Sequence, residues 1–409
     1  MALSWIYTQH ENRILDAVYA LSHAKNLDDF YKGVGLIHAP GLNVMYGDAK
    51  NNIAWITAGK LYMMDKTVNP NFILNGANGA DDKKEFLDFK DNPAAINPPW
   101  HYVYSSNNQT EAISGYLYPG YYLPKDRAQR IESLLQSKNS WTKKDVSNMI
   151  LDNTSSTAPE IVSNWLPTIA VASASANEQK AVAILKQWKG TNSLNDVAPT
   201  IYSKWVYFYL KNTFQDELGA DNFTTFLGTH IMKQIIGPQS ANEQSPWWDN
   251  VKSKNRIETR KAVLSQSFHQ AIALLEKQLG NDAVSWTWNK VNVLELNHPM
   301  GKVKALRGFF NVGPFEVPGA NEVINNMIFT YSDNTINEVR SGPSTRRIID
   351  FSDVENSWSI LPSGQSGNPM SRHYDDQAEL FAQGKFRKMK LNKQEIIRTS
   401  TKLVLKPGL

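Results

Sequence analysis

The segment Pro98-Pro-Trp-His-Tyr-Val-Tyr-Ser-Ser-Asn-Asn108 and the segment Lys125-Asp-Arg-Ala-Gln-Arg-Ile-Glu-Ser-Leu-Leu135 flank a loop rich in tyrosine, proline and glycine. In the first segment, the aromatic and β-branched residues from His101 to Ser105 predict a short strand that ends in two asparagines. In the second, apolar residues recur at helical spacing, which predicts a helix with Arg127 in its first turn. The expected order is therefore strand, loop and helix.

Two side chains of this region are suited to catalysis. Asn107 is a neutral hydrogen-bond donor at the expected strand end, and Arg127 is a cation that keeps its charge near neutral pH. The loop between them is long enough to bring both side chains into one cleft. Asn107 and Arg127 are therefore the candidate catalytic residues.

The composition indicates an ordinary soluble globular protein and excludes several classes. The 409 residues are 41% apolar and 20% charged, and the net charge of +4 is small for this length. Because no dense block of lysine and arginine occurs, we expect no nucleic-acid partner. The absence of cysteine excludes disulfides, thiolate metal sites and a cysteine nucleophile in this chain. No apolar run is long enough for a membrane span and the N-terminus lacks the apolar core of a signal peptide, so we expect neither.

Patterning predicts an α+β protein in three parts. Residues 1–124 contain strands, a hairpin and a loop that borders the expected pocket; residues 125–285 are mostly helical; residues 286–409 return to β structure. The elements expected with definite bounds are a strand at Leu3–Tyr7, helices at Ile14–Ala24, Trp141–Leu151 and Thr259–Leu279, a helix capped by Asn26, and a hairpin of Leu42–Tyr46 with Ile53–Thr57.

Local motifs for chemistry are few. The eight histidines show no metal-ligand spacing, and no Walker loop, dinucleotide glycine pattern or Gly-x-Ser-x-Gly occurs. His373 to Asp376 is explained better by a capped helix start than by a metal site, and Asp152 and Ser155 are expected to cap a helix. Ser366 has no local base and is not taken as a nucleophile. We therefore assign no metal ligands, and the residues alone indicate an α+β protein with aromatic pockets.

Several motifs in register resemble the penicillin acylase family of amidohydrolases, which use an N-terminal nucleophile. The Asn-Asn pair and the Arg-Ala-x-Arg-Ile helix start are two of them. The others are the hairpin Asn-Val-Met-Tyr-Gly-Asp-Ala-Lys-Asn-Asn-Ile-Ala-Trp from Asn43, Asn297-His-Pro-Met-Gly301, Gly342-Pro-Ser-Thr-Arg-Arg-Ile-Ile-Asp350, Leu361-Pro-Ser-Gly-Gln-Ser-Gly367 and His373-Tyr-Asp-Asp-Gln377. The resemblance extends over nearly the whole chain, from about Trp5 to Gln377.

This resemblance implies a fold and roles for four residues. The fold would be the four-layer αββα sandwich of N-terminal-nucleophile hydrolases, present in part, with a helical lobe. Asn107 would stabilise the oxyanion and Arg127 would support the active site. Trp5 and Leu42 would form walls of the acyl pocket, although a tryptophan near a chain start and an aliphatic strand residue are also typical core residues.

The resemblance also implies an activity and partners. The protein would hydrolyse a small-molecule acyl amide of the penicillin, cephalosporin or acyl-homoserine-lactone type through an acyl-enzyme. The chain matches the C-terminal part of the large subunit, so we expect the nucleophile to lie on an N-terminal portion or small subunit that acts as its partner, and the isolated chain to be inactive. Ser4 does not fit that role. No cofactor is expected in this chain, calcium is possible in the complete protein, and the family implies a periplasmic or extracellular location.

Two other classes of function stay open at this point. The chain can be a non-catalytic or degenerate homologue with a structural or binding role. It can also be a carbohydrate- or peptide-binding protein that uses its 12 tryptophans and 16 tyrosines. Aromatic platforms on an exposed face would favour the second class.

Overall fold

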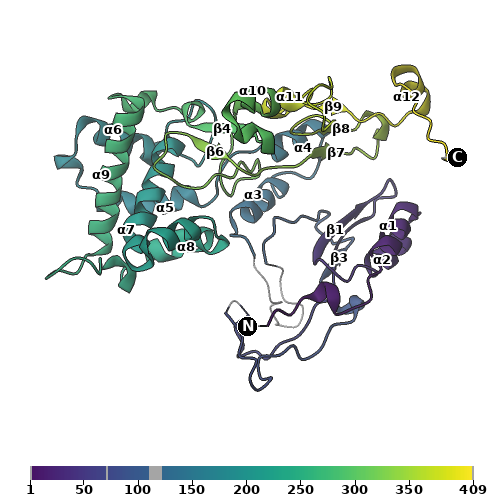
Figure 1. The fold of residues 1–409 in the computed structure, drawn as a ribbon, viewed down its shortest axis with the longest axis horizontal. Coiled ribbons are helices and arrows are strands. Elements are labelled where there is room, and N and C mark those ends of the chain that lie inside the picture. The colour runs from purple at the N-terminus through teal and green to yellow at the C-terminus, as the bar shows by residue number, and fades with distance from the viewer. Residues whose placement is uncertain (1, 71, 110–121, 408–409) are drawn as a thin grey trace. The chain divides into compact units, whose positions relative to one another are not determined.

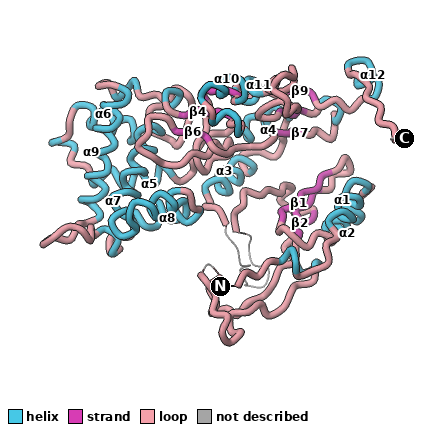
Figure 2. The backbone as a smooth tube through the Cα atoms, viewed as in Figure 1, coloured by secondary structure: helices cyan, strands magenta, loops and turns pink. Residues whose placement is uncertain are grey.

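The computed structural model describes residues 2–70, 72–109 and 122–407. The chain divides into two compact units, Met1–Leu123 and Pro124–Leu409, which are described separately (Figure 1). Helices and small sheets occur in both units, as expected for an α+β protein (Figure 2). The predicted division at residue 285 stays a prediction.

The first unit begins with a 3₁₀ turn and two helices. The expected strand at Leu3–Tyr7 is wrong, because the Trp5 carbonyl accepts hydrogen bonds from the amide and hydroxyl of Thr8 and closes a turn at Ile6–Thr8. Helix α1 spans Ile14–His23 and helix α2 spans Leu27–Val34. The Asn26 side chain accepts a hydrogen bond from the Asp29 amide at 2.9 Å, so its predicted capping role is confirmed.

A three-stranded antiparallel sheet follows the two helices. Its order is β1-β2-β3, with β1 at Leu42–Gly47, β2 at Ile53–Ala58 and β3 at Ala94–Ile96. The predicted hairpin is confirmed, and Asp48 holds its turn by accepting hydrogen bonds from the amides of Lys50 and Asn52. Apolar residues of α1, α2 and β2 pack into a small core; its fully buried members include Ala17, Val34, Ala54 and Ile56.

The strand expected at His101–Ser105 does not form. These residues pair with no strand among the described residues, and His101 has a left-handed φ of 62° that a strand does not allow. The preceding prolines remove backbone donors, and the Pro98 carbonyl accepts from the His101 amide to close a turn. The strand that pairs with β2 lies earlier, at Ala94–Ile96.

The second unit is helical over its first half. Helix α4 starts at a capping box formed by Thr142 and Asp145, slightly later than predicted. Helix α7 is interrupted at Gly219, whose φ of 76° is non-helical, and helix α9 matches its predicted bounds closely and ends at Gly280 with φ 93°. The helices are α3 at Asp126–Leu135, α4 at Lys143–Ile150, α5 at Ala158–Trp165, α6 at Ala176–Gln187, α7 at Ala198–Leu227, α8 at His230–Ala241 and α9 at Arg260–Leu279.

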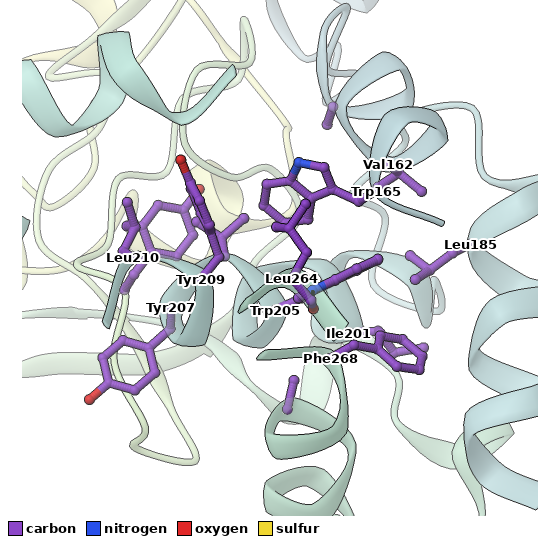
Figure 3. Packing of buried hydrophobic residues seen from close by; sticks show 14 of the residues in the cluster. Val162, Trp165, Leu185, Ile201, Trp205, Tyr207, Tyr209, Leu210, Leu264 and Phe268 are labelled. Atoms are coloured by element: carbon purple, nitrogen blue, oxygen red, sulfur yellow. Dashed lines mark hydrogen bonds between the residues drawn. The ribbon is translucent and has the colours of Figure 1, made fainter. Parts of the chain in front are cut away.

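Aromatic side chains form the centre of this helical region (Figure 3). Trp205 on α7 is fully buried, and its ring lies 5.0 Å from that of Trp165 and 4.9 Å from that of Phe268, both edge to face. Its indole nitrogen donates to the Leu264 carbonyl at 3.0 Å. Helices α5, α7 and α9 are therefore joined through one ring cluster, which explains many of the tryptophans as core residues.

The second half of this unit carries two small sheets and short helices. One sheet has the order β5-β4-β6, with β4 antiparallel to β5 and parallel to β6, and the other has the order β7-β8-β9. The elements are β4 at Asn292–Leu296, α10 at Arg307–Phe310, β5 at Val312–Glu316, β6 at Asn337–Val339, β7 at Arg346–Ile348, β8 at Trp358–Ile360, α11 at Ala378–Ala382, β9 at Arg387–Lys388 and α12 at Lys393–Thr399.

Candidate functional site

Asn107 and Asn108 lie in one turn and have different roles in it. The Asn108 side chain accepts hydrogen bonds from the amide and hydroxyl of Ser106, which holds the turn. Asn107 has a left-handed φ of 61°, its carbonyl accepts from the Leu123 amide at 2.9 Å, and the residue is exposed. Asparagine is one of the few residues that tolerate this conformation. The backbone therefore presents Asn107 at the surface of its unit while Asn108 stabilises the turn.

The two expected pocket residues lie in the same unit as Asn107. Trp5 is 55% exposed, and its ring lies 5.1 Å from that of Tyr7. Leu42 is 43% exposed at the start of β1, where it pairs with Ala58. Neither residue is a core residue of its unit, and their role at an acyl group stays a prediction.

Arg127 lies in the second unit, in the first turn of α3 as expected. Arg130, one turn later, anchors this helix through a two-point ion pair with Asp152, with Nε–Oδ1 and Nη2–Oδ2 distances of 3.0 and 2.6 Å. This ion pair holds α3 in place and so determines the positions of Asp126 and Arg127 in its first turn.

The expected capping role of Asp152 is wrong, because α5 begins at Ala158 with Thr157 as its N-cap residue, and the Asp152 carboxylate accepts from the Thr154 amide instead. The Ser155 hydroxyl does accept from the amide of Ala158, the first residue of α5, although Ser155 is not the N-cap residue.

A cavity of about 580 Å³ opens beside the start of α3 in this second unit. Its lining includes aromatic residues from α7 and from the segments that precede β4 and β6. It also includes charged residues from the start of α3, from α5 and α8, and from the segment at 320–322. Its size lies within the usual range for small-molecule sites. The lining residues used below are Asp126, Trp188, Tyr202, Lys233, Trp288, Glu322, Phe329 and Tyr331.

Glu322 and Lys233 form a buried ion pair at the cavity wall. Lys233 Nζ donates to Glu322 Oε1 at 2.6 Å, and the two side chains are only 11% and 9% exposed. Glu322 has a left-handed φ of 55°. Arg127 Nε lies 4.0 Å from the other carboxylate oxygen. Burial lowers the pKa of Arg127, and the charges of Glu322 and Asp126 act in the opposite direction.

Asp126 is the second carboxyl group of the cavity. It accepts a hydrogen bond from the Thr157 hydroxyl. Burial raises its pKa from the usual 3.8 to about 6; the Thr157 hydrogen bond opposes this rise, and the charge of Glu322 adds to it. The carboxyl group therefore changes charge just below neutral pH.

Replacing Asp126 by asparagine should stabilise the protein near neutral pH and have little effect in acid. The pKa of Asp126 is higher in the folded protein than in the unfolded chain, so on raising the pH Asp126 loses its proton more readily in the unfolded chain. Its presence therefore lowers the free energy of unfolding progressively from about pH 4 to about pH 6, and by the full amount above that. The amide removes this cost, up to about 3 kcal/mol, and still accepts from Thr157. Urea unfolding of both proteins at about pH 4 and about pH 7.5 measures it. An equal difference in stability at the two pH values would contradict the assignment.

The structure assigns the predicted residues to two units. Trp5, Leu42 and Asn107 belong to Met1–Leu123, and Arg127 belongs to Pro124–Leu409. Sequence reasoning missed Asp126, Lys233 and Glu322. Asp126 adjoins Arg127 and a pairing of charges there could have suggested it, whereas Lys233 and Glu322 lie 89 positions apart with no motif linking them.

The described residues contain no group of three or more His, Asp or Glu side chains able to hold a metal ion. No helix in the described part of the chain combines the length and apolar character needed to cross a membrane.

The comparisons with known proteins define the family. The penicillin amidase family model matches residues 1–398, so this chain belongs to the penicillin amidase family. An acyl-homoserine lactone acylase QuiP of Pseudomonas aeruginosa is 24% identical over 434 residues, covering 98% of this chain and 50% of the relative. The QuiP protein of Pseudomonas syringae pv. syringae is 25% identical over 425 residues, with 97% and 50% covered. The chain thus spans about half the length of these curated relatives.

A solved structure confirms the fold. The thermostable penicillin G acylase from Alcaligenes faecalis matches with a TM-score of 0.63 at 15% identity, covering 99% of this chain and 74% of that one. The expected N-terminal-nucleophile hydrolase fold is therefore confirmed, together with the α+β class. At this identity the match defines the fold and not the substrate.

Proposed function

We propose that this chain acts in the hydrolysis of small-molecule acyl amides of the penicillin, cephalosporin or acyl-homoserine-lactone type. The family match over residues 1–398 is the observation that carries the proposal. The names of the relatives, acyl-homoserine lactone acylases, and the fold shared with a penicillin G acylase support the same reaction type.

In the proposed mechanism, an N-terminal Ser, Thr or Cys attacks the amide carbonyl, and its own α-amine takes the proton from the hydroxyl or thiol. The tetrahedral intermediate collapses with release of the protonated amine, and water then hydrolyses the acyl-enzyme to the free acid. An N-terminal portion or small subunit of the same acylase supplies the nucleophile. In this proposal the chain is inactive without that portion.

The proposed roles follow the chemistry of the side chains. The Asn107 amide donates a hydrogen bond to the oxyanion, and its exposed position in a turn held by the Asn108 side chain suits such a donor. Arg127 stays protonated and acts by electrostatics or positioning rather than as an acid or base. Trp5 and Leu42, both exposed, contact the acyl group. Calcium in the complete protein and a periplasmic or extracellular location belong to the same proposal.

The test uses the native protein together with every polypeptide that co-purifies with it. Intact masses under denaturing conditions should reveal a polypeptide that begins with Ser, Thr or Cys. Amine release should be detected with benzylpenicillin, a cephalosporin or N-acyl-homoserine lactones of short, medium and long acyl chain. A preparation with that second polypeptide but no amine release from any substrate would favour the alternative, a non-catalytic or degenerate homologue.

A further inference from the structure

The cavity beside α3 contains a carboxylate, Asp126, that forms no ion pair with any described residue. In the part of the chain that the structure describes, Asp126 accepts a side-chain hydrogen bond from Thr157 and forms no ion pair. Glu322, in contrast, is paired with Lys233 at 2.6 Å. A buried carboxylate is stabilised far more by a cation than by one neutral hydroxyl. Two carboxylates that line this cavity, Asp126 and Glu160, therefore form no ion pair with a described residue, and of these Asp126 is the less exposed.

Tyrosine and tryptophan rings surround the same space. Tyr202 is deep in the unit yet keeps accessible surface, because it lines the cavity, and its hydroxyl bonds to no other described residue. Asp126, Tyr202 and Tyr331 all line this cavity, and the negative charge of Asp126 contributes to the raised pKa of both phenols. The ring of Phe329 lies 5.4 Å from that of Tyr331 and 5.8 Å from that of Trp288, so these three lining residues form one ring cluster, called the aromatic wall below.

We propose that this cavity binds a small organic ammonium compound, with its ammonium group at Asp126 and its apolar part against the aromatic wall. An ammonium group donates hydrogen bonds to a carboxylate and to phenol oxygens, and aromatic faces attract it further. A carboxylate ligand would meet Asp126 as a like charge. Of the two lysines that line the cavity, Lys233 is engaged by Glu322 and Lys125 lies at an exposed position. This inference concerns binding and stands apart from the proposed hydrolysis.

Three probes of similar shape and different charge test the proposal: 2-phenylethylamine, 2-phenylethanol and phenylacetate. In calorimetric titrations of the full chain near neutral pH, 2-phenylethylamine should bind with the highest affinity, 2-phenylethanol with a lower one and phenylacetate with the lowest. The amine should bind about tenfold or more tightly than the alcohol, as expected for a charge-assisted hydrogen bond in a buried site. Equal affinities for amine and alcohol, or no detectable binding of the amine, would overturn the proposal.

Matched variants locate the ammonium group. Asp126→Asn should lower the affinity for 2-phenylethylamine about tenfold or more and leave the affinity for 2-phenylethanol unchanged. Glu160→Gln, at an exposed position of the same cavity, should change neither affinity appreciably. Unchanged amine binding by Asp126→Asn, or an equal loss in Glu160→Gln, would refute the site. If Asp126→Asn fails to fold, Tyr202→Phe provides a second test, because it removes only the hydroxyl. It should lower the affinity for 2-phenylethylamine more than the affinity for phenylacetate.

The pH dependence provides an independent readout in the wild-type protein. Asp126 faces the charges of Glu322 and Arg127, and the phenols of Tyr202 and Tyr331 feel its charge. Because burial raises its pKa to about 6, amine affinity should fall as the pH is lowered through that value, and alcohol affinity should not. An amine affinity that is constant from neutral to acidic pH would exclude Asp126 as its partner.

Discussion

Replacing Trp205 by alanine should lower the free energy of unfolding by about 3–5 kcal/mol. The ring is fully buried between Trp165 and Phe268, so its loss removes contacts to two helices and leaves a large apolar cavity (Figure 3). The indole hydrogen bond to the Leu264 carbonyl is lost as well. Urea unfolding followed by far-ultraviolet circular dichroism measures the change. Tyr202 lies one turn earlier on α7, so cavity binding should weaken together with stability.

A second tryptophan of the same unit serves as the matched control. Trp247 is 37% exposed and its ring lies 5.2 Å from that of Phe214 at the edge of the cluster. Trp247→Ala removes the same number of atoms but less buried area, so it should cost only about 1 kcal/mol. Similar losses in both variants would show that burial in this cluster does not determine the stability of the unit.

Replacing Asn107 by glycine should reduce amide hydrolysis by about two to three orders of magnitude, if Asn107 is the oxyanion donor of the proposed reaction. Glycine accepts the left-handed φ of 61° without strain, so the turn is kept while the amide is removed. The loss should appear in kcat rather than KM, because the hydrogen bond forms with the charged intermediate. Steady-state kinetics of the native protein and the variant measure it.

The choice of glycine separates donor loss from backbone strain. Asn107→Ala removes the same amide but pays about 1–2 kcal/mol for a left-handed residue with a Cβ atom, so it should also lower stability. Asn108→Ala is the neighbouring control: it loses the hydrogen bonds from Ser106 and should destabilise the turn, with a smaller loss of kcat. Full activity of Asn107→Gly would remove the assignment, as would an equal kcat loss in Asn108→Ala.

Local sequence signals predicted the elements that local interactions stabilise. The hairpin of β1 and β2 follows from two alternating segments and the side-chain hydrogen bonds of Asp48, and α9 follows from its apolar period, the Thr259 cap and the terminal Gly280. The strand expected at His101–Ser105 failed for the opposite reason. Its composition favours a strand, but a strand forms only where a partner backbone is available, and that place beside β2 is taken by Ala94–Ile96.

The sequence by itself determined the family, the α+β class and the position of Arg127 in the first turn of a helix. The sequence also identified Asn107 as a candidate residue, but its exposure and its left-handed φ were known only from the structure. The tertiary structure alone decided the cavity, the pairing of Lys233 with Glu322 and the raised pKa of Asp126. The reason is physical: propensity, capping and hydrogen bonds within a turn act between neighbours, whereas burial and ion pairing depend on residues that the folded chain brings together from distant positions.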